Sequence, residues 1–200
     1  MHYPRRRTFS IDGYHPEVSV EKFKNLSKKN RHGYDLVKGH LAHELLDYVH
    51  PECLKVTVLR EPVDRIISHY YYAKRNPDHY LYSKILDSEM SLEEYATSDL
   101  SEELRNWYTT HFSGLTIRDA ERSPENSVAK AIAVILKRYD MIGLLCEFSS
   151  FLGTLRGQAK LRYEYHDKRF NITQNRPDIH SVAQSTITKI EKVNHLDVTL

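Results

Sequence analysis

Arg60 and Ser68 are the residues whose types and spacing best fit a binding chemistry. Arg60 follows an extended apolar run, residues 54–59, and Ser68 lies six residues beyond Pro62, about 9 Å along a helix axis. A guanidinium fork and a hydroxyl at this separation can hold the oxygens of a phosphate. The alternative is structural: Arg60 forms an ion pair with Asp64, and Ser68 is an ordinary helix position.

The segments on either side of Arg60 are predicted to be a strand and a helix. Residues 54–59 are rich in β-branched side chains, which favours a buried parallel strand. Pro62 suits the first position of a helix. The apolar residues that follow it recur at helical spacing: Val63, Ile66, Ile67 and Tyr70. The helix would direct its unpaired N–H groups toward the carboxyl end of the strand, where parallel sheets bind ligands, so the pattern predicts an anion site.

The rest of the chain alternates between short strand patterns and longer helix patterns. Gly39 would end one strand, and Ser91 and Glu94 have the spacing of a capping box at the start of a helix. Because no repeat or linker divides residues 1–200, we expect one domain of the α/β class, a parallel β-sheet flanked by helices. Strands are expected at residues 34–38 and 141–145, and helices at 91–97, 101–112, 127–139 and 181–193.

Composition excludes several classes of protein. The net charge of +2 argues against nucleic acid binding through bulk charge. No apolar stretch approaches the roughly 18 residues that a membrane span requires, and the first ten residues do not form a secretory signal. Twelve histidines and two cysteines give no metal-binding motif beyond the spacing of His40 and His43, so we expect no metal. The compartment and the oligomeric state stay open.

Residues 59–72, with the sequence LREPVDRIISHYYY, resemble the 3'-phosphate-binding segment of the membrane-associated sulfotransferases, the group that contains heparan sulfate 2-O-sulfotransferase. The family pattern R-[DE]-P-x-x-R-x-x-S-x-Y-Y is met in full. In that family, the arginine and serine at the positions of Arg60 and Ser68 bind the 3'-phosphate of 3'-phosphoadenosine 5'-phosphosulfate. The resemblance implies a P-loop-like sulfotransferase fold with this nucleotide as co-substrate.

Further segments extend the resemblance from about residue 35 to the end of the chain. One of them contains His40, which stands where the family has a histidine thought to be the catalytic base. The segments are residues 38–40 (KGH), like a glycine-histidine element; 106–114 (NWYTTHFSG), like N-x-Q-T-R-x-L-S-G; and 170–177 (FNITQNRP), like N-x-T-x-N-R-P. The likeness therefore covers most of the sequence.

Two departures from the family pattern bear on activity. Tyr108 and Thr110 stand where the family usually has Gln and Arg, so ligand contacts are not transferred to these positions. The P-K-x-G-[GS]-T-like loop that holds the 5'-phosphosulfate in the family has no counterpart in this sequence. The chain is therefore expected to be an N-terminally truncated sulfotransferase: a fragment, a chain with a misassigned start, or a degenerate copy.

The resemblance implies transfer of a sulfuryl group from the nucleotide to a hydroxyl, with a carbohydrate as acceptor. His40 would take the acceptor proton while Arg60 and Ser68 hold the nucleotide. The alternatives are a protein that binds a nucleotide or glycan without transfer and, for His40, a strand-end histidine satisfied by the backbone. A relationship to P-loop kinases is disfavoured, because no G-x-x-x-x-G-K-[ST] string is present.

Overall fold

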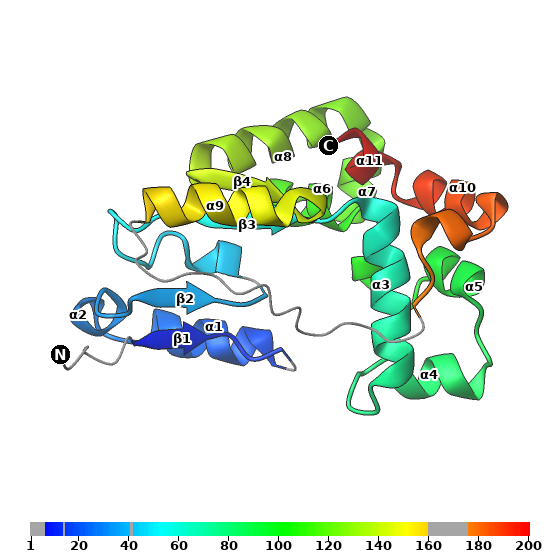
Figure 1. Cartoon of the computed structure of the whole chain (residues 1–200), viewed down its shortest axis with the longest axis horizontal. Helices are drawn as coiled ribbons and strands as arrows, with labels where there is room; N and C mark the ends of the chain where they lie inside the picture. Colours follow the sequence, from blue (N-terminus) through cyan, green and yellow to red (C-terminus); the bar gives the residue numbers. More distant parts are fainter. Residues whose placement is uncertain (1–6, 14, 41, 160–175) are drawn as a thin grey trace. The chain divides into compact units, whose positions relative to one another are not determined.

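The computed structural model describes residues 7–13, 15–40, 42–159 and 176–200 (Figure 1). The chain divides into two compact units, Met1–Lys55 and Val56–Leu200, and each unit contains a two-stranded parallel sheet. The chain is thus mixed α/β and mostly helical, which confirms the expected class. The described residues do not form the single parallel sheet that we expected, because each pair of strands belongs to a different unit.

The first unit contains a short parallel strand pair with helices between its strands. Its buried core consists of Ile11, Val20, Phe23 and Leu45. The strand expected at residues 34–38 is confirmed in a shortened form, whereas the first strand was not anticipated because three residues are too few to show a pattern. The elements are β1 (Thr8–Ser10), α1 (Pro16–Lys24), α2 (Lys28–Arg31), β2 (Leu36–Lys38) and the 3-10 helix η1 (Ala42–Leu45).

Gly39 ends β2, as expected, for two physical reasons. Its φ of +132° is a conformation that other residues rarely adopt. A Cβ at this position would also lie 2.7 Å from the Cβ of Ile11, which is too close for any other residue. The Ile11 N–H donates to the Lys38 carbonyl at 2.8 Å, so the chain is tied down just before the glycine.

The second unit contains the other strand pair and most of the helices. The strands expected at residues 54–59 and 141–145 and the helices expected at 91–97, 127–139 and 181–193 are confirmed, with shifted ends. The expected burial of the strand at residues 54–59 is wrong, because no residue of β3 is buried and Val56 is 37% exposed. Its elements are β3 (Val56–Leu59), α3 (Pro62–Arg75), α4 (Tyr82–Asp87), α5 (Leu92–Thr97), η2 (Glu102–Leu104), α6 (Trp107–Ser113), α7 (Ile117–Arg122), α8 (Pro124–Arg138), β4 (Met141–Leu144), η3 (Leu145–Glu147), α9 (Phe148–Gln158), η4 (Ile179–Ser181), α10 (Gln184–Val193) and α11 (His195–Thr199).

One expected helix, residues 101–112, is wrong. The segment forms η2 and then α6, because Asn106 between them adopts the left-handed conformation with φ +47° and ψ +38°. A left-handed residue breaks the run of helical hydrogen bonds, and asparagine is among the few residues that tolerate this geometry.

Helices pack on both faces of the β3–β4 sheet, although Ile142 and Leu144 of β4 stay 40% and 49% exposed. In this sheet Val56 lies opposite Met141, and the register continues to the end of both strands. On one face, a Cβ at Gly143 would lie 2.5 Å from the Phe151 ring, so α9 can approach closely only because this residue is glycine. On the other face, Leu59 packs against a cluster of α6 and α8 residues, Phe112, Ala131 and Ile135. This arrangement fixes the end of β3, where Arg60 follows.

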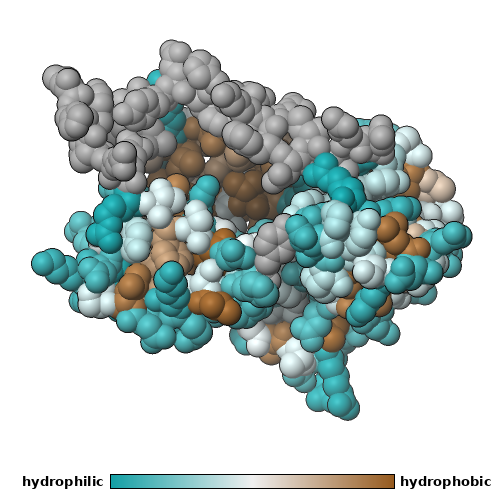
Figure 2. Space-filling view, turned by 90° about the horizontal axis from the view of Figure 1, so that it is seen from below, coloured by the Kyte–Doolittle hydropathy of each residue, from teal (hydrophilic) through white to brown (hydrophobic). Residues whose placement is uncertain are grey.

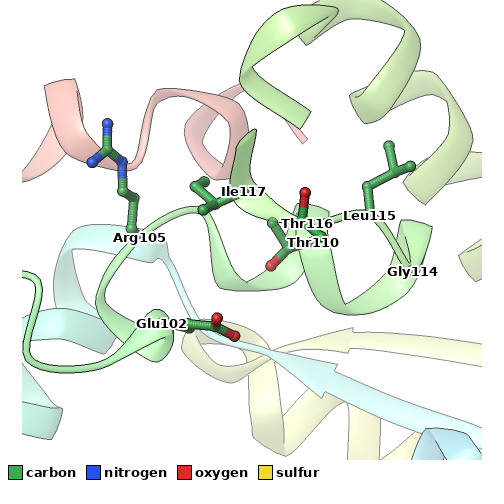
Figure 3. Close-up of a pocket in the computed structure, with 7 residues that line it drawn as sticks. All are labelled: Glu102, Arg105, Thr110, Gly114, Leu115, Thr116 and Ile117. Carbon is green, nitrogen blue, oxygen red and sulfur yellow. The ribbon is translucent and has the colours of Figure 1, made fainter. Parts of the chain in front are cut away.

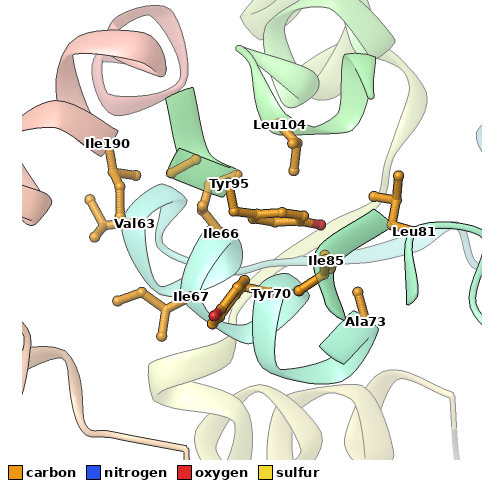
Figure 4. Close-up of a cluster of buried hydrophobic side chains, with 11 residues drawn as sticks. Val63, Ile66, Ile67, Tyr70, Ala73, Leu81, Ile85, Tyr95, Leu104 and Ile190 are labelled. Atoms are coloured by element: carbon orange, nitrogen blue, oxygen red, sulfur yellow. The ribbon is translucent and has the colours of Figure 1, made fainter. Parts of the chain in front are cut away.

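The largest buried cluster fixes α3 against the other helices of the second unit (Figure 4). The stripe predicted for α3 is confirmed as buried, and Ile66 and Ile67 have no exposed surface. We expected this stripe to face the sheet, but it packs against other helices, because the cluster contains no strand residue. Lys74, at the end of the stripe, is exposed and donates to the Tyr70 hydroxyl at 3.0 Å. The cluster consists of Val63, Ile66, Ile67, Tyr70, Ala73, Leu81, Ile85, Tyr95, Ala96, Leu104 and Ile190.

The described helices are all too short or too polar to span a bilayer, in agreement with the sequence. Where Figure 2 draws described residues, much of the surface is hydrophilic, with hydrophobic residues in patches between the polar ones.

Candidate functional site

The turn between β3 and α3 presents Arg60 beside a helix that is already capped. The Glu61 carboxylate accepts hydrogen bonds from the backbone N–H groups of Val63 at 2.9 Å and Asp64 at 2.6 Å. We expected these N–H groups to bind an external anion. In the structure they bind the Glu61 side chain instead, so this part of the predicted anion site is wrong. A carboxylate at a helix N-terminus is stabilised by the same N–H groups and dipole that attract a phosphate. An anion at this turn must therefore rely on side chains.

The Arg60 side chain is partly buried and pairs with Asp64. Its Nε lies 3.4 Å from Asp64 Oδ2, and its side chain is 30% exposed. Burial lowers the pKa of Arg60, with a smaller opposing effect from Tyr108. The ion pair between Arg60 and Asp64, which we considered as an alternative to a binding role, is thus present. A guanidinium has five N–H donors, so Arg60 can bind a ligand oxygen as well.

A second guanidinium, that of Arg176, reaches the same carboxylate. Its Nη2 contacts Asp64 Oδ1, so Asp64 lies between two arginines that are far apart in the sequence. Burial first, and then the like charge of Arg60, lower the pKa of Arg176. The opposite charge of Asp178 raises the pKa of Arg176, so a second carboxylate besides Asp64 acts on this pair of arginines. In the sequence, Arg176 belongs to the segment 170–177 that resembles the family, but we assigned it no role. Residues 170–175 of that segment lie outside the described residues.

Ser68 lies on the side of α3 that also carries Asp64, because the two residues are one helical turn apart. Its side chain is partly exposed. Within the described part of the chain, its hydroxyl makes no hydrogen bond, and none joins it to Arg60. Ser68 therefore lies one helical turn from Asp64, the residue whose carboxylate Arg60 and Arg176 share.

His40 follows Gly39 directly and is exposed. It belongs to the first unit, whereas Arg60, Ser68 and Arg176 belong to the second. The alternative role for His40 was a histidine whose ring forms a hydrogen bond with the backbone. Among the described residues, no such bond is found. These residues also contain no cluster of three His, Cys, Asp or Glu side chains that could hold a metal ion.

Two residues beside Arg60 went unassigned in the sequence. The Tyr108 hydroxyl accepts a hydrogen bond from the Arg60 backbone N–H at 3.1 Å, and its ring centre lies 5.3 Å from the Arg65 guanidinium. Arg65 is the second arginine of the family pattern, and its Nε and Nη2 are buried without a hydrogen-bond partner within the described residues. Burial lowers its pKa. The pattern could have drawn attention to Arg65, but no sequence signal joins Tyr108 to Arg60.

A pocket of about 220 Å³ lies elsewhere in the second unit, around α6 and the loop that follows it (Figure 3). Its polar groups are largely engaged: Arg105 pairs with Glu121 at 2.8 Å, and the Thr110 hydroxyl donates to backbone carbonyls. None of the expected site residues lines it. The lining residues are Glu102, Arg105, Thr110, Gly114, Leu115, Thr116 and Ile117.

Arg60, Arg176 and Ser68 together offer two planar cations and a hydroxyl, which suits an anion with several oxygens, such as a phosphate. Asp64 preorganises the two guanidinium groups and also competes with such an anion. Comparison of this chain with protein-family models, with curated proteins and with solved structures finds no match.

Proposed function

We propose that this chain binds 3'-phosphoadenosine 5'-phosphosulfate and transfers its sulfuryl group to a carbohydrate hydroxyl, on a sulfotransferase fold of the P-loop-like type. The observation that carries the binding step is the convergence of Arg60 and Arg176 on Asp64, beside Ser68. The 3'-phosphate of the nucleotide would bind at this cluster. The sequence pattern of residues 59–72 supports the same ligand.

The charges of the cluster favour a phosphate over a neutral ligand. Arg60, Arg176 and Asp64 together carry a net charge of about +1, which the nearby Asp178 carboxylate reduces. Both arginines are partly buried, with side chains 30% and 22% exposed, so solvent screens their attraction less than it would at an open surface. The Ser68 hydroxyl adds a neutral donor that fixes the orientation of the phosphate.

In the transfer step, an acceptor oxygen attacks the sulfur while the bond from sulfur to the phosphate oxygen breaks. The proton of the acceptor hydroxyl passes to His40, and the leaving phosphate keeps the electron pair of the broken bond. The products are a sulfate ester and adenosine 3',5'-bisphosphate. Histidine is the most common general base near neutral pH, and the exposure of His40 allows contact with a large acceptor.

Calorimetric titration with adenosine 3',5'-bisphosphate tests the binding step. Arg60→Ala should weaken the affinity about 10- to 100-fold, because a charged hydrogen bond is worth about 1.5–3 kcal/mol. Ser68→Ala should weaken it about fivefold through loss of a neutral bond. Arg118→Ala, which removes an exposed arginine of α7, is the matched control and should bind like the wild type. Equal affinities for all four proteins would refute the site.

Binding without transfer is the second candidate function. The observation that favours it is that the groups proposed to bind the phosphate, Arg60 and Arg176, belong to the second unit, whereas the proposed base His40 belongs to the first. Transfer of radiolabelled sulfate from the nucleotide to a mixture of glycans separates the two functions. If the chain is an enzyme, the rate of transfer should fall about 10²- to 10⁴-fold in His40→Ala, while the affinity for the nucleotide stays unchanged. Nucleotide binding with no transfer supports the binding protein.

A further inference from the structure

Tyr108 links α6 to the turn that carries Arg60. Its hydroxyl oxygen accepts the Arg60 backbone N–H at 3.1 Å. This N–H lies one residue beyond the end of β3, where the ladder to β4 has ended at the pair of Leu59 and Leu144. A backbone N–H at such a point needs another acceptor. Tyr108 supplies it where the strand gives way to the helix.

Tyr108 is itself held firmly. Its backbone N–H donates to the Asp197 carboxylate at 2.9 Å, and burial raises the pKa of its phenol. Its ring lies 5.3 Å from the guanidinium of Arg65, two of whose buried nitrogens lack a hydrogen-bond partner among the described residues. A cation that is short of hydrogen bonds depends more strongly on the aromatic ring beneath it. The ring thus contacts Arg65 in the first turn of α3, and the hydroxyl contacts Arg60, two residues before the helix begins.

We propose that Tyr108 is a positioning residue of the nucleotide site, whose hydroxyl acts on the bound phosphate only through Arg60. This inference rests on the proposed function. Because the hydroxyl fixes the backbone of Arg60, fewer orientations are open to the arginine side chain, and less entropy is lost when it binds phosphate. Tyr108 stands where the resembling family usually has Gln, so its role follows from the contacts of this chain and not from the family pattern.

Tyr108→Phe isolates the hydroxyl, because it keeps the ring over Arg65 and the backbone bond to Asp197. Tyr80→Phe is the matched control: it removes a hydroxyl that lies 2.8 Å from Ser101 Oγ, outside residues 59–72. In calorimetric titration with adenosine 3',5'-bisphosphate, Tyr108→Phe should bind about three- to tenfold more weakly than the wild type, the worth of about one hydrogen bond. Tyr80→Phe should bind with the affinity of the wild type. If both variants lost affinity, the cause would be a general destabilisation of the second unit, and the inference would be overturned.

A double-mutant cycle with Arg60→Ala tests whether the hydroxyl acts through Arg60. In the Arg60→Ala background, Tyr108→Phe should cause no further loss of affinity. An equal loss in both backgrounds, or wild-type affinity in Tyr108→Phe alone, overturns the positioning role. A wild-type chain that does not bind overturns the proposed function itself, and this inference with it.

Hydrogen exchange of the Arg60 amide in the wild-type chain gives a check that needs no variant to fold. The bond to Tyr108 should slow exchange of this amide well below the rate of an exposed one. Exchange at the exposed rate would contradict the contact on which the positioning role depends.

Discussion

Asp64 sets the charge of the candidate site, because its carboxylate lies between Arg60 and Arg176. The two guanidinium groups repel each other, and the charge of Arg60 lowers the pKa of Arg176 for this reason. The negative charge of Asp64 offsets this repulsion. A phosphate would compete with it for the same donors. One residue therefore both assembles the site and limits its affinity.

Asp64→Asn should bind adenosine 3',5'-bisphosphate about three- to tenfold more tightly at low salt, because the amide keeps the shape of the side chain but removes the competing charge. The gain should shrink as ionic strength rises. Asp87→Asn, at an exposed position of α4, makes the same chemical change and controls for net charge. Calorimetry at two salt concentrations makes the measurement. Weaker binding by Asp64→Asn would mean that the carboxylate only orients the arginines.

At the scale of elements, α3, α5 and α6 each begin with a side-chain carboxylate that accepts a backbone N–H. Glu61 caps α3, and Glu94 closes a capping box with Ser91 at the start of α5. Both carboxylates lie within three residues of the N–H groups that they accept. The carboxylate of α6 comes instead from Asp197, in a distant part of the chain. The first two caps are local features of the sequence, and the third is not.

The capping box of α5 predicts a pH-dependent stability. Hydrogen bonds from the Ser91 side chain and then its backbone lower the pKa of Glu94. Since the unfolded value is higher, near 4.3, the stabilisation is present above about pH 4.3 and is lost as pH falls through the folded value. Glu94→Gln should therefore reduce the acid-induced loss of stability, measured by urea unfolding at neutral and acid pH. Glu125→Gln is the control, because within the described residues Glu125 makes no side-chain hydrogen bond. A wild-type-like acid response in Glu94→Gln would contradict the prediction.

At the scale of the whole molecule, the last helix stabilises the middle of the chain. The Asn106 backbone N–H donates to Asn194 Oδ1 at 3.0 Å, and Asn106 Oδ1 accepts the Leu196 N–H at 2.9 Å. Asp197 accepts the N–H groups of Tyr108 and Thr109 at 2.9 and 2.8 Å. These bonds hold the left-handed turn at Asn106, and through Tyr108 they extend to the Arg60 turn.

Removal of residues 195–200 should therefore destabilise the second unit by about 3 kcal/mol or more, since it deletes buried Leu196 and leaves buried donors of α6 without acceptors. Chemical denaturation of the truncated and full chains measures the difference. Val198→Ala, at a position 50% exposed on the same helix, should cost less than about 1 kcal/mol. A truncated chain as stable as the full one would show that α11 does not support α6.

Local signals in the sequence determined much of the fold around the site. Pro62 marked the start of α3, its apolar stripe marked the buried face, and Gly39 marked the end of β2. The positions of Arg60 at a strand end and of Ser68 on the following helix were also predictable. In each case the cause lies within a few residues along the chain: a fixed φ, a helical period, or a conformation that only glycine adopts readily.

Only the tertiary structure decided which side chains meet. No spacing predicts that Arg176 shares Asp64 with Arg60, that Tyr108 accepts the Arg60 N–H, or that Asp197 caps α6. Local patterns also missed the break at Asn106, because its left-handed conformation is held by bonds to Asn194 and Leu196. Periodicity in a sequence encodes contacts about one helical turn apart, whereas partners distant in sequence meet only after the apolar faces have packed.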